Sequence, residues 1–302
     1  MSIYRYNYIN EYLKEKFGER TLKICIDGNF TCPNRDGTKS NLGCIFCSQK
    51  GSGEHLKFLP IEKQIENYFN SYKSERANKF IVYFQNFTNT YDTIGNLKSK
   101  YDSALIDSRI VGLEVATRPD CINEEICKLL ASYKDNYYVS VELGLQTSNE
   151  NTSKLINRCY SNDDFLNACT LLEKYDIPIV AHIMIGLPNE DLNDLKNTIT
   201  FINNTKIHGI KIHSTYIVKN TILCDMYNNK EYTPITLDEY LDYLEYAITH
   251  LRNDIIIHRL SGDAPKDILV APEWNLHKKW ILNGISKRLK EKKLYQGIYY
   301  DK

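Results

Sequence analysis

The chain has 302 residues, 42% of them hydrophobic and 25% charged, which suffices for one large domain or two small ones with a sizeable core. Its 38 basic and 38 acidic residues cancel, so the net charge does not indicate a nucleic acid or a membrane as partner. No apolar run approaches the roughly 20 residues of a membrane span, and the polar start lacks the apolar centre of a signal peptide. We therefore expect a cytoplasmic protein that binds neither membranes nor DNA.

Short runs rich in β-forming residues alternate with helical segments along the chain. The predicted strands are 22–27, 79–84, 110–116, 137–145, 178–185, 210–217 and 255–260. Helices are predicted between them, for example after Pro60 and after Asn123, which is a suitable N-cap.

This alternation predicts an α/β fold with parallel strands and right-handed crossovers, closed partly or nearly completely into a TIM-like (β/α) barrel. We expect the core to span 1–225 with an N-terminal extension. A C-terminal extension of helices, one added strand and a basic tail, 226–302, is expected to pack on it.

Polar segments follow most of the predicted strands. A cysteine-containing loop follows the first, "QNFTNTYD" the second, "TRPD" the third and "GLPNED" the fifth. In such barrels the chemistry collects in the loops at the carboxyl ends of the strands. These segments are therefore expected to meet on one face.

Three of the nine cysteines, Cys32, Cys44 and Cys47, lie in the stretch "TCPNRDGTKSNLGCIFCS". Clustered cysteines in a cytosolic chain indicate metal binding or redox chemistry more than disulfides. Three thiolates can hold a 4Fe–4S cluster with one iron left free, whereas a structural zinc site needs a fourth ligand. Cys25 could supply that ligand, although its place in an apolar strand favours packing. Unligated thiols are the third alternative at this point.

The motifs resemble one family in chain order. "CIDGNFTCPNRDGTKSNLGCIFC", "YFQNFTNTY", "GLEVATRPDC", "VELGLQT", "HIMIGLP" and "RLSGDAPKDILVAPEW" resemble the YhcC/YtqA-type family of radical S-adenosylmethionine (SAM) enzymes over roughly 5–290. Two features depart from the wider superfamily. Eleven residues, not three, separate the first two cysteines, and "FQNFTNTY" replaces the glycine-rich motif after the second strand.

The resemblance implies a barrel of the radical SAM type and assigns roles to particular residues. Cys32, Cys44 and Cys47 would be the catalytic metal ligands, each binding one iron, while the fourth iron chelates SAM. Gln146 and Arg158 match a SAM-contacting pair of the oxygen-independent coproporphyrinogen oxidases, with Arg158 facing a carboxylate. The cofactor-binding residues implied in this way are Phe46, Gln85, Asn86, Thr88, Glu114, Gln146, Arg158, His182 and Gly186.

Two regions are candidates for contacting a substrate. Arg259, Asp263 and Lys266 follow the last predicted strand, and Arg35 lies in the cysteine loop. The tail "HKKWILNGISKRLKEKK" carries seven basic residues against one acid, a pattern that can follow phosphates, as in tRNA, but also occurs on solvated helix faces.

The resemblance implies an enzyme that cleaves SAM reductively to a 5′-deoxyadenosyl radical, with a flavodoxin or ferredoxin as electron donor. "HIMIGLP" also resembles the Elongator catalytic subunit, which makes the wobble-uridine side chain of tRNA the best substrate hypothesis. The alternatives are a radical SAM enzyme acting on a porphyrin-like or other small molecule, and a non-enzymatic cysteine-zinc RNA-binding protein.

Overall fold

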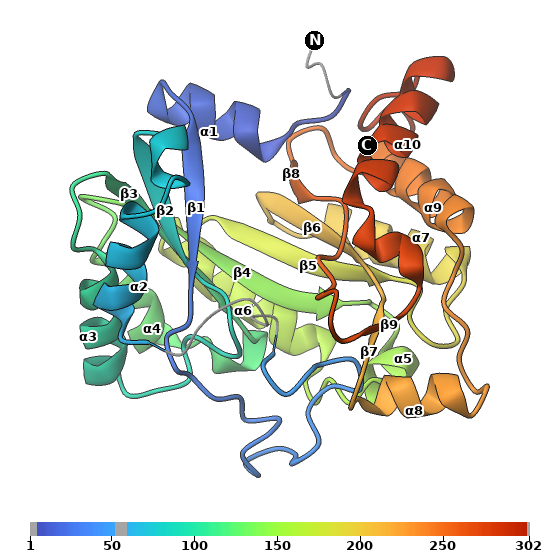
Figure 1. The fold of residues 1–302 in the computed structure, drawn as a ribbon, viewed down its shortest axis with the longest axis horizontal. Coiled ribbons are helices and arrows are strands. Elements are labelled where there is room, and N and C mark those ends of the chain that lie inside the picture. Colours follow the sequence, from blue (N-terminus) through green and yellow to red (C-terminus); the bar gives the residue numbers. More distant parts are fainter. Residues whose placement is uncertain (1–4, 52–58, 301–302) are drawn as a thin grey trace.

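The computed structural model describes residues 5–51 and 59–300, and its centre is a seven-stranded parallel sheet (Figure 1). The strands lie in the order β1-β2-β3-β4-β5-β6-β8. Their bounds are β1 Thr21–Ile26, β2 Lys79–Phe84, β3 Ile110–Thr117, β4 Tyr138–Gln146, β5 Ile179–Ile185, β6 Gly209–Ser214 and β8 Ile256–Arg259. The predicted α/β fold with parallel strands is confirmed as a half-barrel.

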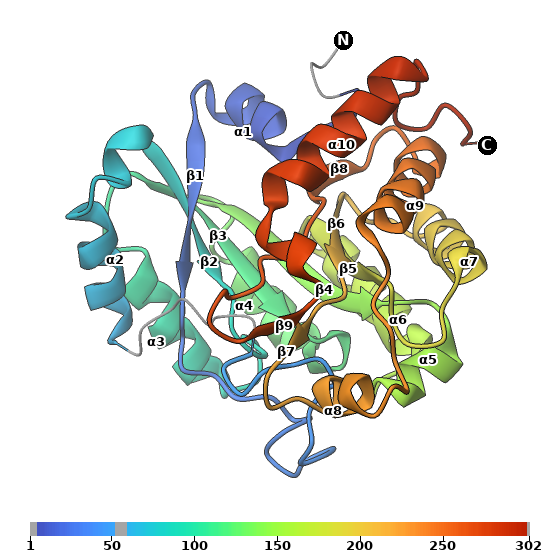
Figure 2. The ribbon, with the colours of Figure 1, turned by 45° about the vertical axis from the view of Figure 1, so that its right-hand side comes forward.

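Helices cover the outer face of the curved sheet (Figures 1 and 2). This layer includes α2 Ile61–Phe69, α3 Ile94–Ala104, α4 Glu124–Ala131, α6 Asn162–Lys174, α7 Leu192–Asn203 and α9 Leu237–His250. The remaining helices of this part of the chain are α5 Glu150–Leu155, α8 Ile222–Asn228 and α10 Lys278–Glu291, with short 3-10 turns at Ser74–Arg76, Pro119–Cys121 and Glu273–Leu276. The predicted N-cap is confirmed, because the side chain of Asn123 accepts a hydrogen bond from Ile126 N.

Side chains alternate along each strand between two environments. Ile24, Val82 and Val141 belong to the buried core shared with the helices, as do their neighbours two residues away. The intervening positions face the inside of the half-barrel. Because of this period of two, buried strands carry apolar side chains on the face toward the helices and polar side chains on the face toward the inside of the half-barrel.

The barrel is not closed by strand pairing. Within the described residues, β1 pairs in the sheet only with β2, and β8 only with β6. Helix α1, Ile9–Phe17, contacts both outer strands, and its Ile9 and Leu13 pack against Ile81 at the amino end of the sheet. Tyr8 also forms a β-bridge with Ile257, so the N-terminal segment bridges the gap.

The C-terminal part contributes to the same sheet and to a small second one. The strand predicted at 210–217 is two strands, since β6 ends at Ser214 and β7, Ile217–Val218, pairs antiparallel with β9, Leu269–Ala271. β8 extends the main sheet, while α9 and α10 pack against each other. The division at residue 225 remains a prediction. Within 5–51 and 59–300, no helix has both the length and the apolar character to span a bilayer.

Candidate functional site

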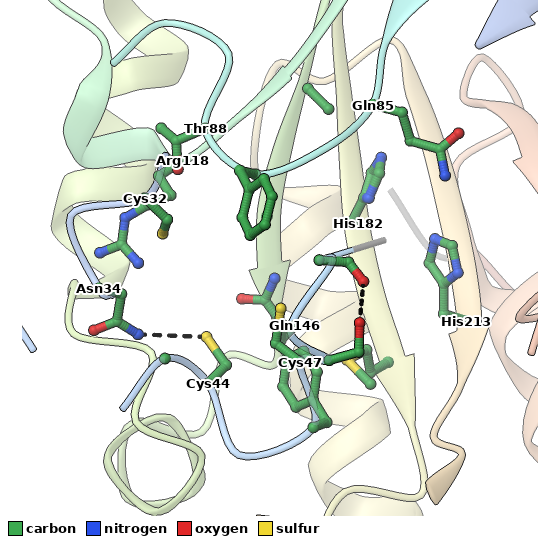
Figure 3. Close-up of a pocket in the computed structure, with 18 of the residues that line it drawn as sticks. Cys32, Asn34, Cys44, Cys47, Gln85, Thr88, Arg118, Gln146, His182 and His213 are labelled. Atoms are coloured by element: carbon green, nitrogen blue, oxygen red, sulfur yellow. Dashed lines mark hydrogen bonds between the residues drawn. The ribbon is translucent and has the colours of Figure 1, made fainter. Parts of the chain in front are cut away.

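A pocket of about 270 Å³ opens at the carboxyl ends of the strands, and all three cysteines of the loop line it. Figure 3 shows Cys32, Cys44 and Cys47 on one side, with His182 and His213 on neighbouring strands across the pocket. Residues 32–47 and the ends of β2 to β6 therefore meet on one face, as the loops after the strands predict.

Hydrogen bonds within the cysteine loop hold the sulfurs together. Cys47 N donates to Cys44 O (2.9 Å), which closes a tight turn around Phe46. Arg35 Nη2 donates to the carbonyls of Cys47 (2.7 Å) and Ser48 (2.6 Å). Arg35, a predicted substrate residue, lines the pocket, and these hydrogen bonds also stabilise the conformation of the loop.

Asn34 connects the same loop to the residues that follow α5. Its buried Nδ2 lies 3.6 Å from Cys44 Sγ and donates to Asn157 O (2.6 Å). Ile45 N also bonds Ile156 O (3.1 Å). The long insertion between the first two cysteines is thus anchored to the barrel.

The surroundings of Cys44 disfavour the ionised thiolate. Burial, and then the neighbouring Cys47, raises the pKa of Cys44 to about 12, and Cys32 adds to the effect. A thiolate at Cys44 is therefore disfavoured in the protein alone and would be stabilised by a bound cation. Cys25 lines a different cavity, which removes it as the fourth ligand of a zinc site.

Several of the predicted cofactor-binding residues line the pocket with the cysteines: Phe46, Gln85, Thr88, Gln146 and His182. Gln146 is fixed at the end of β4, with a backbone φ of 60°. Tyr160 Oη bonds its Oε1 (2.8 Å), which leaves the Nε2 amide as the donor available to a ligand.

Asn86 and Gly186 lie outside the lining. Asn86 is buried and donates to Asp27 Oδ2 (3.0 Å), away from the pocket. Gly186 has φ +85°, and its carbonyl accepts a bond from Tyr232 Oη (2.6 Å). The glycine is needed for this turn, because few side chains adopt such a backbone conformation.

Arg158 also lies outside the pocket and is fully buried. Its Nη1 donates to the carbonyls of Leu145 (2.7 Å) and Thr147 (2.9 Å), and its Nε to that of Tyr160 (2.9 Å). The guanidinium thus supports the turn after β4, and the expectation that it faces a ligand carboxylate is not met by this geometry.

Arg118, which the sequence reasoning did not select, faces the pocket beside Cys32 (Figure 3). Its Nε and Nη2 pair with Asp120 at 2.9 Å, and its Nη1 donates to Arg158 O (3.1 Å). Burial opposes its charge, but Asp120 outweighs this and raises the pKa of Arg118. "TRPD" was recognised as a family motif, so the signal for this residue was present.

Glu114 lies three residues before the end of β3, not at its end, and does not line the pocket. It pairs with Lys23 of β1. The carboxylate that does line the pocket is Glu142 of β4, which the sequence reasoning missed.

Glu142 is the centre of a buried polar network. Its Oε2 accepts hydrogen bonds from Tyr83 Oη (2.5 Å) and Lys211 Nζ (2.5 Å), and lies 2.7 Å from His182 Nε2. Lys23 Nζ lies 3.5 Å from the other oxygen. Burial opposes ionisation, but the two lysines outweigh it and hold the pKa of Glu142 well below its ordinary value.

The pKa values of the groups around Glu142 shift in different directions. Burial lowers the pKa of Lys211 to about 8 and lowers that of His182, while burial and then Glu142 raise the pKa of Tyr83 well above 10.0. The histidine and tyrosine are therefore neutral at pH 7. The pocket wall thus offers the neutral side chains of His182 and Tyr83, which contact the buried carboxylate of Glu142.

The four predicted substrate residues do not lie together in one site. Arg35 and Asp263 line the cysteine pocket, whereas Arg259 lines a second cavity and Lys266 is exposed. Asp263 joins the two regions, since its carboxylate lies 3.0 Å from Arg259 Nη1 and 3.2 Å from Lys278 Nζ.

The basic tail forms α10 and the turn after it, and acids neutralise part of it. Arg288 pairs with Asp238 (3.2 Å) and with Asp242 of α9, and Lys292 pairs with Glu245 (2.8 Å). Its field is therefore weaker than the sequence of the tail alone indicates.

Comparison with known families decides what kind of site this is. Residues 37–202 match the model of the radical SAM superfamily, and residues 207–291 match its C-terminal domain. The chain belongs to the radical SAM superfamily. It is a radical SAM enzyme, and the family implies SAM and an iron–sulfur cluster. The non-enzymatic zinc alternative is accordingly wrong.

Two relatives confirm the resemblance to the YhcC/YtqA-type family. The radical SAM chain is 34% identical to protein YtqA of Bacillus subtilis over 99% of its length and 94% of that protein. It is 33% identical to protein YhcC of Escherichia coli, over 87% and 85%. It is also 27% identical to the tRNA uridine(34) acetyltransferase of Methanocaldococcus jannaschii, over 54% of this chain and 30% of that protein.

The half-barrel is shared with a solved structure. The archaeal Methanocaldococcus infernus Elp3 superposes with a TM-score of 0.70 at 18% identity, covering 91% of this radical SAM chain and 64% of that one. This likeness supports the fold.

Proposed function

We propose that Cys32, Cys44 and Cys47 hold a 4Fe–4S cluster through three of its irons and leave the fourth iron to SAM. The observation that carries the proposal is that three cysteines, no more, line the pocket among the described residues. Thiolates are the soft ligands that such clusters take. When bound and reduced, the cluster supplies the electron that cleaves the sulfonium of SAM to a 5′-deoxyadenosyl radical.

The chain's own side chains would position SAM beside the cysteines. Phe46, which precedes Cys47 in the chain, lines the pocket, and Gln146 offers its amide, held by Tyr160. Asn34 donates toward Cys44 Sγ, and hydrogen bonds to sulfur tune the potential of a cluster. The partly enclosed pocket limits the access of water to a reactive intermediate.

We infer that the substrate is the wobble uridine side chain of tRNA. The support is the similarity to the tRNA uridine(34) acetyltransferase, whose name states that substrate. Exposed basic residues of α10 such as Lys279 and Lys290 could contact the RNA backbone. A porphyrin-like or other small molecule is the second candidate, because the pocket is small and its lining largely buried.

The cluster is tested by anaerobic reconstitution, followed by measurement of iron, sulfide and 5′-deoxyadenosine formed from SAM with a flavodoxin or ferredoxin reducing system. We expect about four irons in the wild type and loss of cluster and product in Cys47→Ala. Cys121→Ala is the matched control, since Cys121 is partly buried near Cys32 but does not line the pocket. Equal iron content in Cys47→Ala and the control would contradict the assignment.

The substrate is tested separately. Wobble nucleosides from a deletion strain are compared by mass spectrometry with those from strains complemented by the wild type or by Cys47→Ala. A precursor nucleoside should accumulate in the deletion and Cys47→Ala strains, and identical profiles in all three would rule out the tRNA substrate.

A further inference from the structure

A second cavity, of about 240 Å³, lies at the opposite end of the half-barrel from the cysteine loop. We call it the rear cavity. Side chains of α1, β1, β8 and α10 surround it, and these elements meet at one side of the molecule (Figures 1 and 2). Its basic and imidazole lining consists of Lys23, Lys211, His258, Arg259 and Lys278. Tyr83 lines both cavities and separates them.

The lining is rich in donors and poor in negative charge. Within the part of the chain that the structure describes, the rear cavity has no aspartate or glutamate in its wall. The carboxylates that pair with its cations, Glu114, Glu142 and Asp263, do not line it, although oxygens of Glu114 and Glu142 lie within 4.8 Å of a ring nitrogen of His258. Four cationic side chains thus share three carboxylates, because Arg259 and Lys278 pair with the same Asp263.

Hydrogen-bonding capacity remains on several of these groups. Lys211 Nζ has three N–H groups and bonds Glu142 (2.5 Å) and Tyr83 (3.3 Å). The guanidinium of Arg259 has five N–H groups, and the ion pair of its Nη1 with Asp263 uses only one edge of it. His258 Nδ1 is buried without a hydrogen-bond partner among the described residues.

We propose that the rear cavity binds a phosphate-type oxyanion. Such an anion brings several acceptor oxygens and a negative charge to a place where donors from three strands converge, and the guanidinium of Arg259 can bind two of its oxygens at once. The anion balances the excess positive charge of the wall. The proposal is independent of the cluster, of SAM and of tRNA as substrate. The phosphate group belongs either to a small molecule or to the backbone of an RNA.

The test is a titration of the anaerobically purified protein with inorganic phosphate at constant ionic strength, followed by isothermal calorimetry. We expect saturable 1:1 binding, weakened at least about tenfold in Arg259→Gln, which loses the charge-assisted contact of the guanidinium with two oxygens. His258→Gln should weaken binding as well. Lys279→Gln is the matched control, because Lys279 is an exposed cation of α10 outside the rear cavity. Thermal unfolding confirms that each variant is folded.

Absence of saturable binding, unchanged affinity in Arg259→Gln, or equal weakening in Lys279→Gln would overturn the proposal. Once phosphate binding is established, a filter-binding assay with tRNA identifies the source. Competition by phosphate, and weaker binding of tRNA by Arg259→Gln than by Lys279→Gln, would assign the site to the RNA backbone. Unchanged tRNA binding in Arg259→Gln would assign it to a small phosphorylated molecule.

Discussion

Replacing Lys211 by Met is the sharpest test of the network inside the half-barrel. Methionine keeps the length of the lysine stem but leaves the buried carboxylate of Glu142 without its 2.5 Å ion pair. Breaking a buried pair by removing one partner typically costs 3–5 kcal/mol. Glu142 would keep its contacts with Tyr83 and His182, and Lys23 lies 3.5 Å from its other oxygen. We therefore expect the lower end of that range, about 3 kcal/mol.

The assay is equilibrium unfolding in urea at pH 7 of the wild type, Lys211→Met, Glu142→Gln and the double variant. The double variant should lose less stability than the two single variants together, by at least about 1 kcal/mol, because the second change removes the charge that the first left unpaired. Additive losses within about 0.5 kcal/mol would show that the two groups do not interact and would refute the reasoning.

Three further predictions concern single residues. Burial raises the pKa of Glu190 to about 7, so the unfolded chain loses this proton at lower pH than the folded protein. The free energy of unfolding of the wild type therefore falls as the pH rises from 4.5 to 7. Relative to the wild type, Glu190→Gln should gain about 2 kcal/mol of stability as the pH rises from 5 to 8, measured by thermal unfolding. Asn34→Ala removes the donor to Cys44 and should make the reduction potential of the reconstituted cluster more negative in a redox titration. Gly144→Ala would place a Cβ 2.6 Å from Gln146 Nε2 and should weaken SAM binding at least tenfold by calorimetry.

Each of these has an outcome that contradicts it. A constant difference between Glu190→Gln and the wild type across the pH range would show that Glu190 is not protonated in the folded state. An unchanged reduction potential in Asn34→Ala would show that the Asn34 side chain does not influence the cluster through Cys44 Sγ. Wild-type SAM affinity in Gly144→Ala would show that the Gln146 side chain can move aside without weakening SAM binding.

The sequence predicts the strands well because each is a short apolar run ended by polar residues. Strand β2 begins and ends at the predicted residues, β3 ends one residue later than predicted, and β4 is shifted by one residue at both ends. The split between β6 and β7 was not foreseen, since 210–217 reads as one β-rich run. What divides it is a tertiary contact, the antiparallel pairing with β9.

The polar side chains inside the half-barrel were harder to predict than the strands. Lys23, Tyr83, Glu142 and Lys211 interrupt apolar strands at alternate positions, which a period-two count would have revealed as a polar inner face. Their pairing depends on the curvature that brings β1 near β4 and β6, and no local pattern encodes that. Arg158 shows the same limit, because only the folded turn after β4 offers carbonyls for its guanidinium.

Helix α1 and the residues before it have a consequence for the association state of the protein. An outer strand exposes backbone groups that can pair with another chain, and proteins commonly cover such edges. Here Ile257 N donates to Asn7 O (2.7 Å), so the N-terminal segment occupies part of the outer edge of β8 while Ile9 and Leu13 close the end of the barrel. The segment therefore leaves less of this edge free to pair with another chain, and we predict that a chain shortened to begin at Arg20 self-associates through its freed strand edges.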